Sequence, residues 1–114
     1  MKLLGIDPGL RNMGWGVIET DGNRLIYAGD GVVKSDPNLS LAERLVQLHD
    51  GLLLVIERFQ PKEAAVEETF VNVNPASTLK LGQARGIALF VPSKSGLRVA
   101  EYSPNLIKKS LVGS

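Results

Sequence analysis

The sequence of 114 residues predicts an α/β fold, a single mixed β-sheet with helices packed on its faces. Apolar runs typical of strands recur along the chain and end at turn residues. The first three runs are separated only by short turns, whereas the later ones alternate with helix-like segments. Antiparallel strands followed by parallel strands are therefore expected, in one domain covering residues 1–114.

The first third of the chain predicts three strands joined by hairpins. Residues 2–6 form a nearly all-apolar run that closes in the turn sequence Asp7-Pro8-Gly9. Residues 14–20 alternate apolar and smaller or polar side chains and then reach Asp21-Gly22-Asn23, a hairpin signal. Residues 24–33 should return antiparallel to them, with the first strand in the centre of the sheet.

The clearest element is a helix that follows the hairpins. Ser40 and Glu43 have the spacing of a capping box, which satisfies free N–H groups at a helix start. Pro61 stops the helix, and a strand at residues 64–67 follows. Steps of four and three residues place one apolar stripe along it: Leu41, Leu45, Leu48, Leu52, Val55 and Phe59.

A second helix is predicted over residues 74–91. Pro75 suits its first turn, where the missing N–H costs nothing, and Pro92 is expected to end it. A strand at residues 98–102 and a final helix at residues 104–111 complete the predicted elements. The order is that of a ribonuclease H-like fold.

Composition restricts the classes of protein and of site. The chain has no cysteine, which excludes a disulfide framework and a thiolate zinc site, and no apolar run long enough to cross a bilayer. A cytoplasmic protein without membrane contact is expected. The net charge of residues 1–68 is −4, and that of residues 69–114 is +5. This asymmetry indicates a polyanionic partner, or two faces that cancel within the fold.

Two predicted strands end in carboxylates. Asp7 either projects into the crevice where open α/β sheets bind ligands or caps its own turn. If the strand at residues 64–67 lies beside the first strand, Asp7 meets either Glu67 or Glu68, since adjacent residues point to opposite faces. Paired carboxylates repel and require a cation or a shared proton. Hard oxygen ligands favour magnesium or manganese, although a glutamate at a strand end can also be merely solvated.

Other residues suit contact with nucleic acid. Phe70 opens a polar loop after the acids, where an aromatic side chain stacks on bases or packs in the core. Basic and amide side chains that can contact phosphates, or remain solvated, follow on the last two predicted helices: Lys80, Gln83, Arg85, Lys108 and Lys109.

Two glycines lie one turn apart inside the second predicted helix. Gly82 and Gly86 each cost about 1 kcal/mol relative to alanine, so they are expected to serve a close approach of another backbone. That backbone is the sheet of the same domain or a helix of a partner, and we favour the partner.

Several blocks of sequence together form a specific pattern. They are Gly5-Ile6-Asp7-Pro8-Gly9 with Gly14 and Gly16, Val66-Glu67-Glu68-Thr69-Phe70, Leu79-Lys80-Leu81-Gly82-Gln83-Ala84-Arg85-Gly86, and the segment from Val99 to Gly113. These blocks closely resemble the RuvC family of bacterial Holliday-junction resolvases. The resemblance covers essentially the whole chain, and the third block is its most distinctive part.

The resemblance implies a ribonuclease H-like nuclease that works as a homodimer on four-way DNA junctions in recombination and repair. Such enzymes make paired nicks and act with a branch-migration helicase complex in the bacterial cytoplasm. The family's complete site holds two Mg²⁺ ions, or Mn²⁺, about 4 Å apart.

By motif position, Asp7 matches the family's first catalytic aspartate, a ligand of both ions, and Glu67, not Glu68, matches its glutamate, a ligand of one. Phe70 matches an aromatic residue implicated at the junction, and Lys108 a lysine that supports catalysis or phosphate contact. Gly82 and Gly86 match a region near the dimer interface.

The sequence departs from the family pattern at its end. The remaining catalytic acids of the family lie on a later helix, and the sequence reaches Ser114 before such a block. We therefore expect a C-terminally truncated domain with an exposed sheet face and an under-coordinated metal site. Glu101 is the one candidate substitute for the missing acids, and we give that substitution little weight. The leading alternative is a catalytically impaired junction-binding or dimerising module. A nucleotide-binding domain of the actin and sugar-kinase type is disfavoured, because Leu10-Arg11-Asn12 replaces the expected hydroxyl residues.

Overall fold

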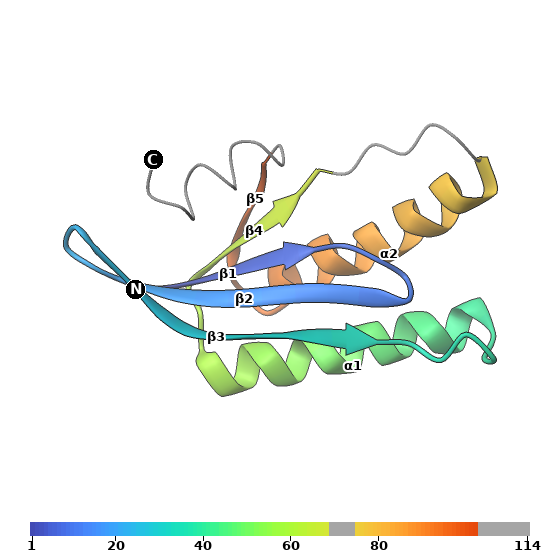
Figure 1. The fold of residues 1–114 in the computed structure, drawn as a ribbon, viewed down its shortest axis with the longest axis horizontal. Helices are drawn as coiled ribbons and strands as arrows, with labels where there is room; N and C mark the ends of the chain where they lie inside the picture. Colours follow the sequence, from blue (N-terminus) through green and yellow to red (C-terminus); the bar gives the residue numbers. More distant parts are fainter. Residues whose placement is uncertain (69–74, 103–114) are drawn as a thin grey trace.

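A computed structural model describes residues 1–68 and 75–102 of the chain (Figure 1). One five-stranded sheet runs through these residues in the order β3-β2-β1-β4-β5. Its elements are β1 (Lys2–Asp7), β2 (Asn12–Asp21), β3 (Arg24–Lys34), α1 (Leu41–Phe59), β4 (Glu63–Glu67), α2 (Pro75–Lys94) and β5 (Arg98–Tyr102). The predicted final helix at residues 104–111 lies outside the described residues.

The central strand β1 joins the two halves of the sheet. It pairs antiparallel with β2, which pairs antiparallel with β3. On its other side β1 pairs parallel with β4, and β4 pairs parallel with β5. The predicted mixed sheet with a central first strand is therefore confirmed.

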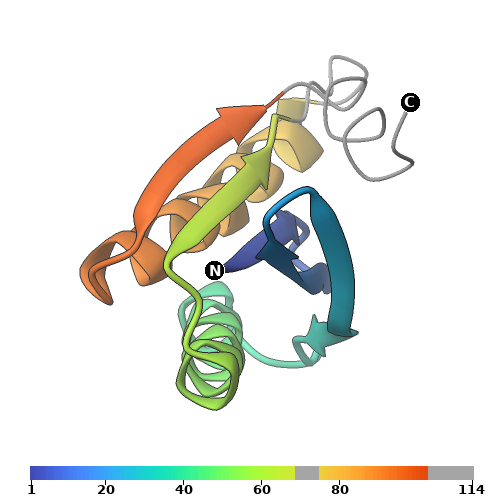
Figure 2. The ribbon, with the colours of Figure 1, turned by 90° about the vertical axis from the view of Figure 1, so that its left-hand side faces the viewer.

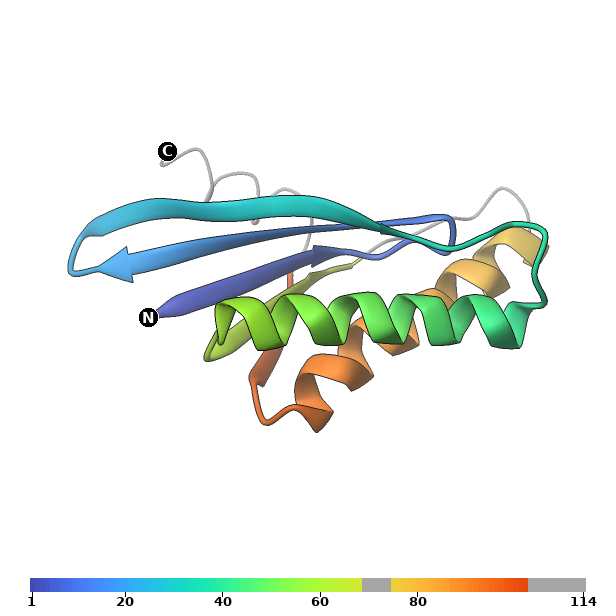
Figure 3. The same ribbon diagram turned by 90° about the horizontal axis from the view of Figure 1, so that it is seen from below.

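Both described helices cover the same face of the sheet, as Figures 2 and 3 show. The strands alternate accordingly: β1 turns Leu4 and Ile6 toward the helices, and β4 turns Ala64 and Val66 the same way. These side chains form one core with the buried stripes of α1 and α2. Within the described residues, the other face of the sheet carries no helix.

Helix α1 begins and ends as its sequence predicts. The Ser40 hydroxyl accepts a hydrogen bond from the Glu43 N–H at 3.2 Å, and the Glu43 carboxylate accepts one from the Ser40 N–H, completing the capping box. At the other end, Gln60 adopts the left-handed conformation with φ 52°, directly before Pro61. The buried residues are Leu48, Leu52, Val55 and Ile56.

Helix α2 is longer than the sequence predicts. The prediction that it stops before Pro92 is wrong, because Pro92 lies inside the last turn and the helix continues to Lys94. The residue that terminates the helix is Gly96, which lies two residues after Lys94 and has a φ of +90°. The N–H of Leu97 donates to the Pro92 carbonyl and that of Gly96 to the Ser93 carbonyl, the pair of bonds that defines a Schellman cap.

Helix α1 approaches β3 closely at Gly51. A Cβ atom there would stand 2.3 Å from Cγ1 of Val33, a separation that real side chains do not adopt. Glycine at this position therefore sets how near the helix lies to the sheet.

No helix in residues 1–68 and 75–102 is long and apolar enough to cross a membrane.

Candidate active site

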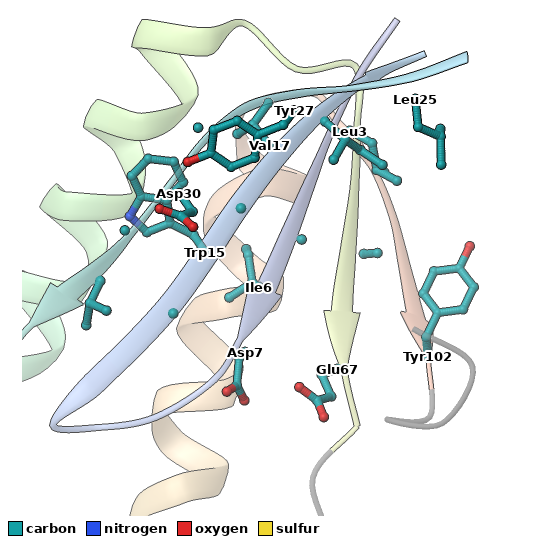
Figure 4. A pocket seen from close by; sticks show the side chains of 18 of the residues that line it. Leu3, Ile6, Asp7, Trp15, Val17, Leu25, Tyr27, Asp30, Glu67 and Tyr102 are labelled. Carbon is teal, nitrogen blue, oxygen red and sulfur yellow. The ribbon is translucent and has the colours of Figure 1, made fainter. Parts of the chain in front are cut away.

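Two carboxylates lie at the same end of the sheet. Asp7 is the last residue of β1 and Glu67 the last of β4, and these strands are parallel neighbours. The register pairs Ile6 with Val66, so the next residues, Asp7 and Glu67, stand opposite one another on strands about 4.8 Å apart. Figure 4 shows both side chains extending from the strand ends into the same space.

The register also decides which glutamate shares a face with Asp7. The face of β1 opposite its core residues carries Leu3, Gly5 and Asp7. Strand β4 alternates in the same register, and the residue at its end that lies on this same face is Glu67. Glu68 follows the strand, and its N–H donates a 2.7 Å hydrogen bond to the Tyr102 carbonyl. The choice that spacing alone left open therefore falls on Glu67.

The carboxylates stand at one end of an apolar groove of about 830 Å³ on the helix-free face of the sheet (Figure 4). Its floor is almost bare backbone, because Gly5, Gly14 and Gly16 lie in the middle of β1 and β2. At the far end stand Leu25 and Tyr27 of β3. Slight desolvation, together with the charge of the nearby Asp30 carboxylate and the hydrogen bond that it accepts, raises the pKa of the Tyr27 hydroxyl from its ordinary value.

The chemistry of Asp7 and Glu67 fits a hard divalent cation. Neighbouring carboxylates repel unless a positive charge or a proton lies between them, and oxygen ligands suit magnesium or manganese. Among the described residues, no group of three or more acidic, histidine or cysteine side chains is placed to hold a metal ion. Within this part of the chain, the donors at this edge are the two carboxylates.

Glu101 does not belong to this group. It pairs in register with Val66, a core residue, whereas Tyr102 pairs with Glu67. The Glu101 side chain therefore lies on the helix-covered face, where its carboxylate forms an ion pair with the Arg85 guanidinium of α2. The expectation that Glu101 could stand in as a metal ligand is wrong for this arrangement.

The family model of crossover junction endodeoxyribonuclease RuvC matches residues 3–114. The chain belongs to the RuvC family. The RuvC of Paramagnetospirillum magneticum is 64% identical over the whole of this chain and 69% of its own length. The RuvC of Rhodospirillum rubrum is 62% identical over the whole of this chain and 68% of its own length. These relatives are named as endonucleases, so the family is one of enzymes.

Solved structures agree with this assignment. Thermus thermophilus RuvC in complex with a Holliday junction substrate matches all of this chain and 70% of its own, with 34% identity and a TM-score of 0.87. A second structure of Thermus thermophilus RuvC matches 99% of this chain and 70% of its own, with a TM-score of 0.84. A yeast mitochondrial Holliday junction resolvase, at 17% identity and a TM-score of 0.66, shares the fold alone. The expected ribonuclease H-like fold is thus confirmed.

The predicted DNA-contact residues of this RuvC-family chain either lie on α2 or fall outside the described residues. Lys80 is exposed on the first half of α2. Gln83 lies on the same helix with its Oε1 atom buried and without a hydrogen-bond partner among the described residues. Arg85 is held by Glu101 rather than turned freely to solvent. Phe70, Lys108 and Lys109 lie outside the described residues.

Gly82 and Gly86 are exposed on α2, and a Cβ atom at either position would meet open space. The sheet of the same domain therefore does not require glycine there, which removes one of the two explanations for these residues. The large apolar side chains Leu79 and Phe90 are 64% and 55% exposed on the same stripe of the helix.

Tyr102 was not singled out from the sequence. It lines the groove beside Glu67, its register partner, and is 36% exposed. Counting the alternation of β5 forward from Val99, which packs against the core, would have placed Tyr102 on this face. The alternation becomes interpretable only once a core residue of the strand is known.

Proposed function

We propose that this chain is a structure-selective DNA endonuclease that resolves four-way (Holliday) junctions in recombination and repair by paired, magnesium-dependent phosphodiester nicks. The observation that carries the proposal is the placement of Asp7 and Glu67 on neighbouring parallel strands, in a fold that matches junction-bound RuvC with a TM-score of 0.87. The junction-bound relative supports the substrate class.

The proposed chemistry assigns separate roles to the two carboxylates. In this proposal Asp7 would ligate both of two magnesium ions, which manganese could replace, and Glu67 would ligate one. Bound ions of this kind stabilise the attacking and leaving oxygens of phosphodiester hydrolysis. The protein's contribution is to hold two anionic side chains together at the strand ends, where their mutual repulsion favours cation binding.

The DNA contacts of the proposal lie around this edge. Lys80 is the exposed cation of the first half of α2, and the charge balance of residues 69–114 is +5. Phe70 and Lys108 are kept as proposed contacts, at the junction and at phosphates, on the strength of their motif positions. Gln83 remains a candidate contact as well.

We propose further that the chain acts as a homodimer through α2. One exposed stripe of the helix consists of residues spaced three and four apart: Leu79, Gly82, Gly86 and Phe90. A large apolar side chain stands at each end of the stripe, and the two glycines leave its centre bare. Glycines in such a stripe allow a second helix to approach closely. A bacterial cytoplasmic location and cooperation with a branch-migration helicase complex complete the proposal.

The proposal is tested with a labelled four-way junction incubated first with EDTA and then with magnesium. We expect a shifted band in EDTA and paired nicks in magnesium. Binding without nicking would instead assign the second candidate function, a junction-binding or dimerising module. That alternative is favoured by one observation, the absence of a third acidic ligand at the site among the described residues.

The variant Asp7→Asn separates cutting from binding. We expect it to lower magnesium-dependent nicking by at least about 100-fold, because it removes a direct ligand, while junction binding in EDTA is unchanged or tighter. Glu68→Gln is the matched control, since it removes the neighbouring acid that does not share a face with Asp7, and it should retain nicking. Equal loss of binding and nicking in Asp7→Asn would contradict the assignment.

A further inference from the structure

Arg85 and Glu101 connect helix α2 to strand β5. The Arg85 guanidinium donates to the Glu101 carboxylate, and the two side chains are 23% and 46% exposed. Arg85 stands directly after Ala84, a core residue, so the ion pair lies at the margin of the core. In the described part of the chain, it is the one short ion pair between a helix and a strand.

Among the described residues, strand β5 is held by its ladder to β4, by Val99, which packs against the core, and by this ion pair. It is a five-residue edge strand in which no side chain is fully buried. Its ladder to β4 pairs Tyr102 with Glu67 and continues one step further, where the Glu68 N–H donates to the Tyr102 carbonyl at 2.7 Å. Glu101 therefore lies one residue from the backbone that flanks Glu67.

We propose that Arg85 is a positioning residue that acts through Glu101: it fixes the end of β5 against α2 and thereby holds the end of β4, where Glu67 stands. This role differs from the phosphate contact expected from the sequence. The planar guanidinium is matched in geometry to a carboxylate and is already occupied by one, whereas Lys80 on the same helix is exposed. The importance of Arg85 for catalysis rests on the proposed function, but the effect of Arg85 on the strand ends does not.

Amide hydrogen exchange tests the physical claim without any requirement for activity. We expect Arg85→Gln and Glu101→Gln each to speed exchange of the Glu68 amide about three- to fivefold, the range that an incompletely buried ion pair supports. The amide of Val17, in the middle of β2, should keep its rate. The exchanged pair Arg85→Glu with Glu101→Arg should return the Glu68 rate toward that of the original chain. The control Lys80→Gln, which removes a cation from the same helix, should have no effect at Glu68. An unchanged Glu68 rate in both single variants would overturn the proposal.

Junction binding distinguishes positioning from phosphate contact. With positioning, both variants bind the junction in EDTA within about twofold of the original chain, the scale of a surface change, and require more magnesium for half-maximal nicking. With phosphate contact, Arg85→Gln binds more weakly and its salt dependence falls by about one unit, whereas Glu101→Gln frees the arginine and binds more tightly. That second pattern would contradict the positioning role. If the original chain binds without nicking, the proposed nuclease function fails, while the exchange rates still decide the role of Arg85.

Discussion

Gly51 is the residue at which the spacing between helix and sheet is set. A Cβ atom there would stand 2.3 Å from Cγ1 and 2.9 Å from Cγ2 of Val33, and a β-branched side chain cannot move aside easily. The cost of that overlap, about 1–3 kcal/mol, exceeds the gain of about 1 kcal/mol that alanine brings to a helix interior.

We therefore expect Gly51→Ala to lower the free energy of unfolding by up to about 2 kcal/mol, the difference of these two effects, measured by urea denaturation. Gly86→Ala is the matched control, because it makes the same change in the other helix, where a Cβ meets open space. At protein concentrations where the chain is monomeric, Gly86→Ala should raise stability by up to about 1 kcal/mol. Equal effects of the two substitutions would contradict this explanation of Gly51.

The acidic residues show how far a sequence can specify a site. Asp7 and Glu67 could be predicted because each ends an apolar run at a turn, and the parallel pairing of their strands brings such ends to one edge. Glu101 could not be excluded in the same way. Its face depends on the register of β5 against β4, which is set by long-range pairing and leaves no local trace in a strand with few apolar residues.

Among the elements, α2 has a face that its own domain leaves uncovered. Its buried side meets the core through Ala84, Ala88 and Val91, while the opposite stripe exposes Leu79, Phe90 and the two glycines between them. An apolar stripe with a bare centre on a helix surface is the geometry that a second, closely packed helix requires.

Gly82→Leu should disrupt a dimer formed through this stripe. A leucine side chain in the bare centre costs about 1–3 kcal/mol by overpacking, so the dimer dissociation constant should rise about 5- to 150-fold. Sedimentation velocity over a range of concentrations measures the change. Lys80→Leu adds the same side chain on the other side of α2 and should leave the sedimentation profile unaltered. An unchanged profile for Gly82→Leu would reject α2 as the dimer interface.

The two helices also differ in how well their ends could be predicted. The start of α1 is encoded locally by Ser40 and Glu43, and the structure confirms it. The end of α2 was misplaced because a proline is a strong stop signal on average, yet proline in the last turn removes only one backbone donor. Pro92 is buried and packs at the end of the core, so tertiary packing outweighs the local signal, and Gly96 provides the stop.

At the scale of the whole molecule, the helices are distributed unevenly over the sheet. Both described helices cover one face, and the other carries the apolar groove, with Leu25, Tyr27 and Val32 of β3 exposed by 54%, 68% and 51%. Contiguous apolar surface of this kind attracts hydrophobic dyes and partners.

The chain should therefore bind the dye ANS at this face in its folded state. We expect the double variant Leu25→Lys, Val32→Lys to lower the ANS fluorescence of the folded chain by at least half. Its free energy of unfolding should change by no more than about 1 kcal/mol, because both side chains are exposed. Val46→Lys, at a residue of α1 that is 56% exposed, places a charge outside the groove and should leave the fluorescence unaltered. Undiminished fluorescence in the double variant would show that the dye binds elsewhere.

The parallel pairing of β1 with β4 has a consequence for the order of folding. Leu3 pairs with Glu63, sixty positions along the chain, with both hairpins and α1 between them. Contacts so distant in sequence form after local ones, since the entropy of a long loop must be lost first. The carboxylates of Asp7 and Glu67 therefore come together late, when the hairpins and the first helix already exist. A cation held by both carboxylates, as proposed above, would bind only the chain in which the two strands are paired, and it would therefore stabilise the folded state over every state in which they are apart.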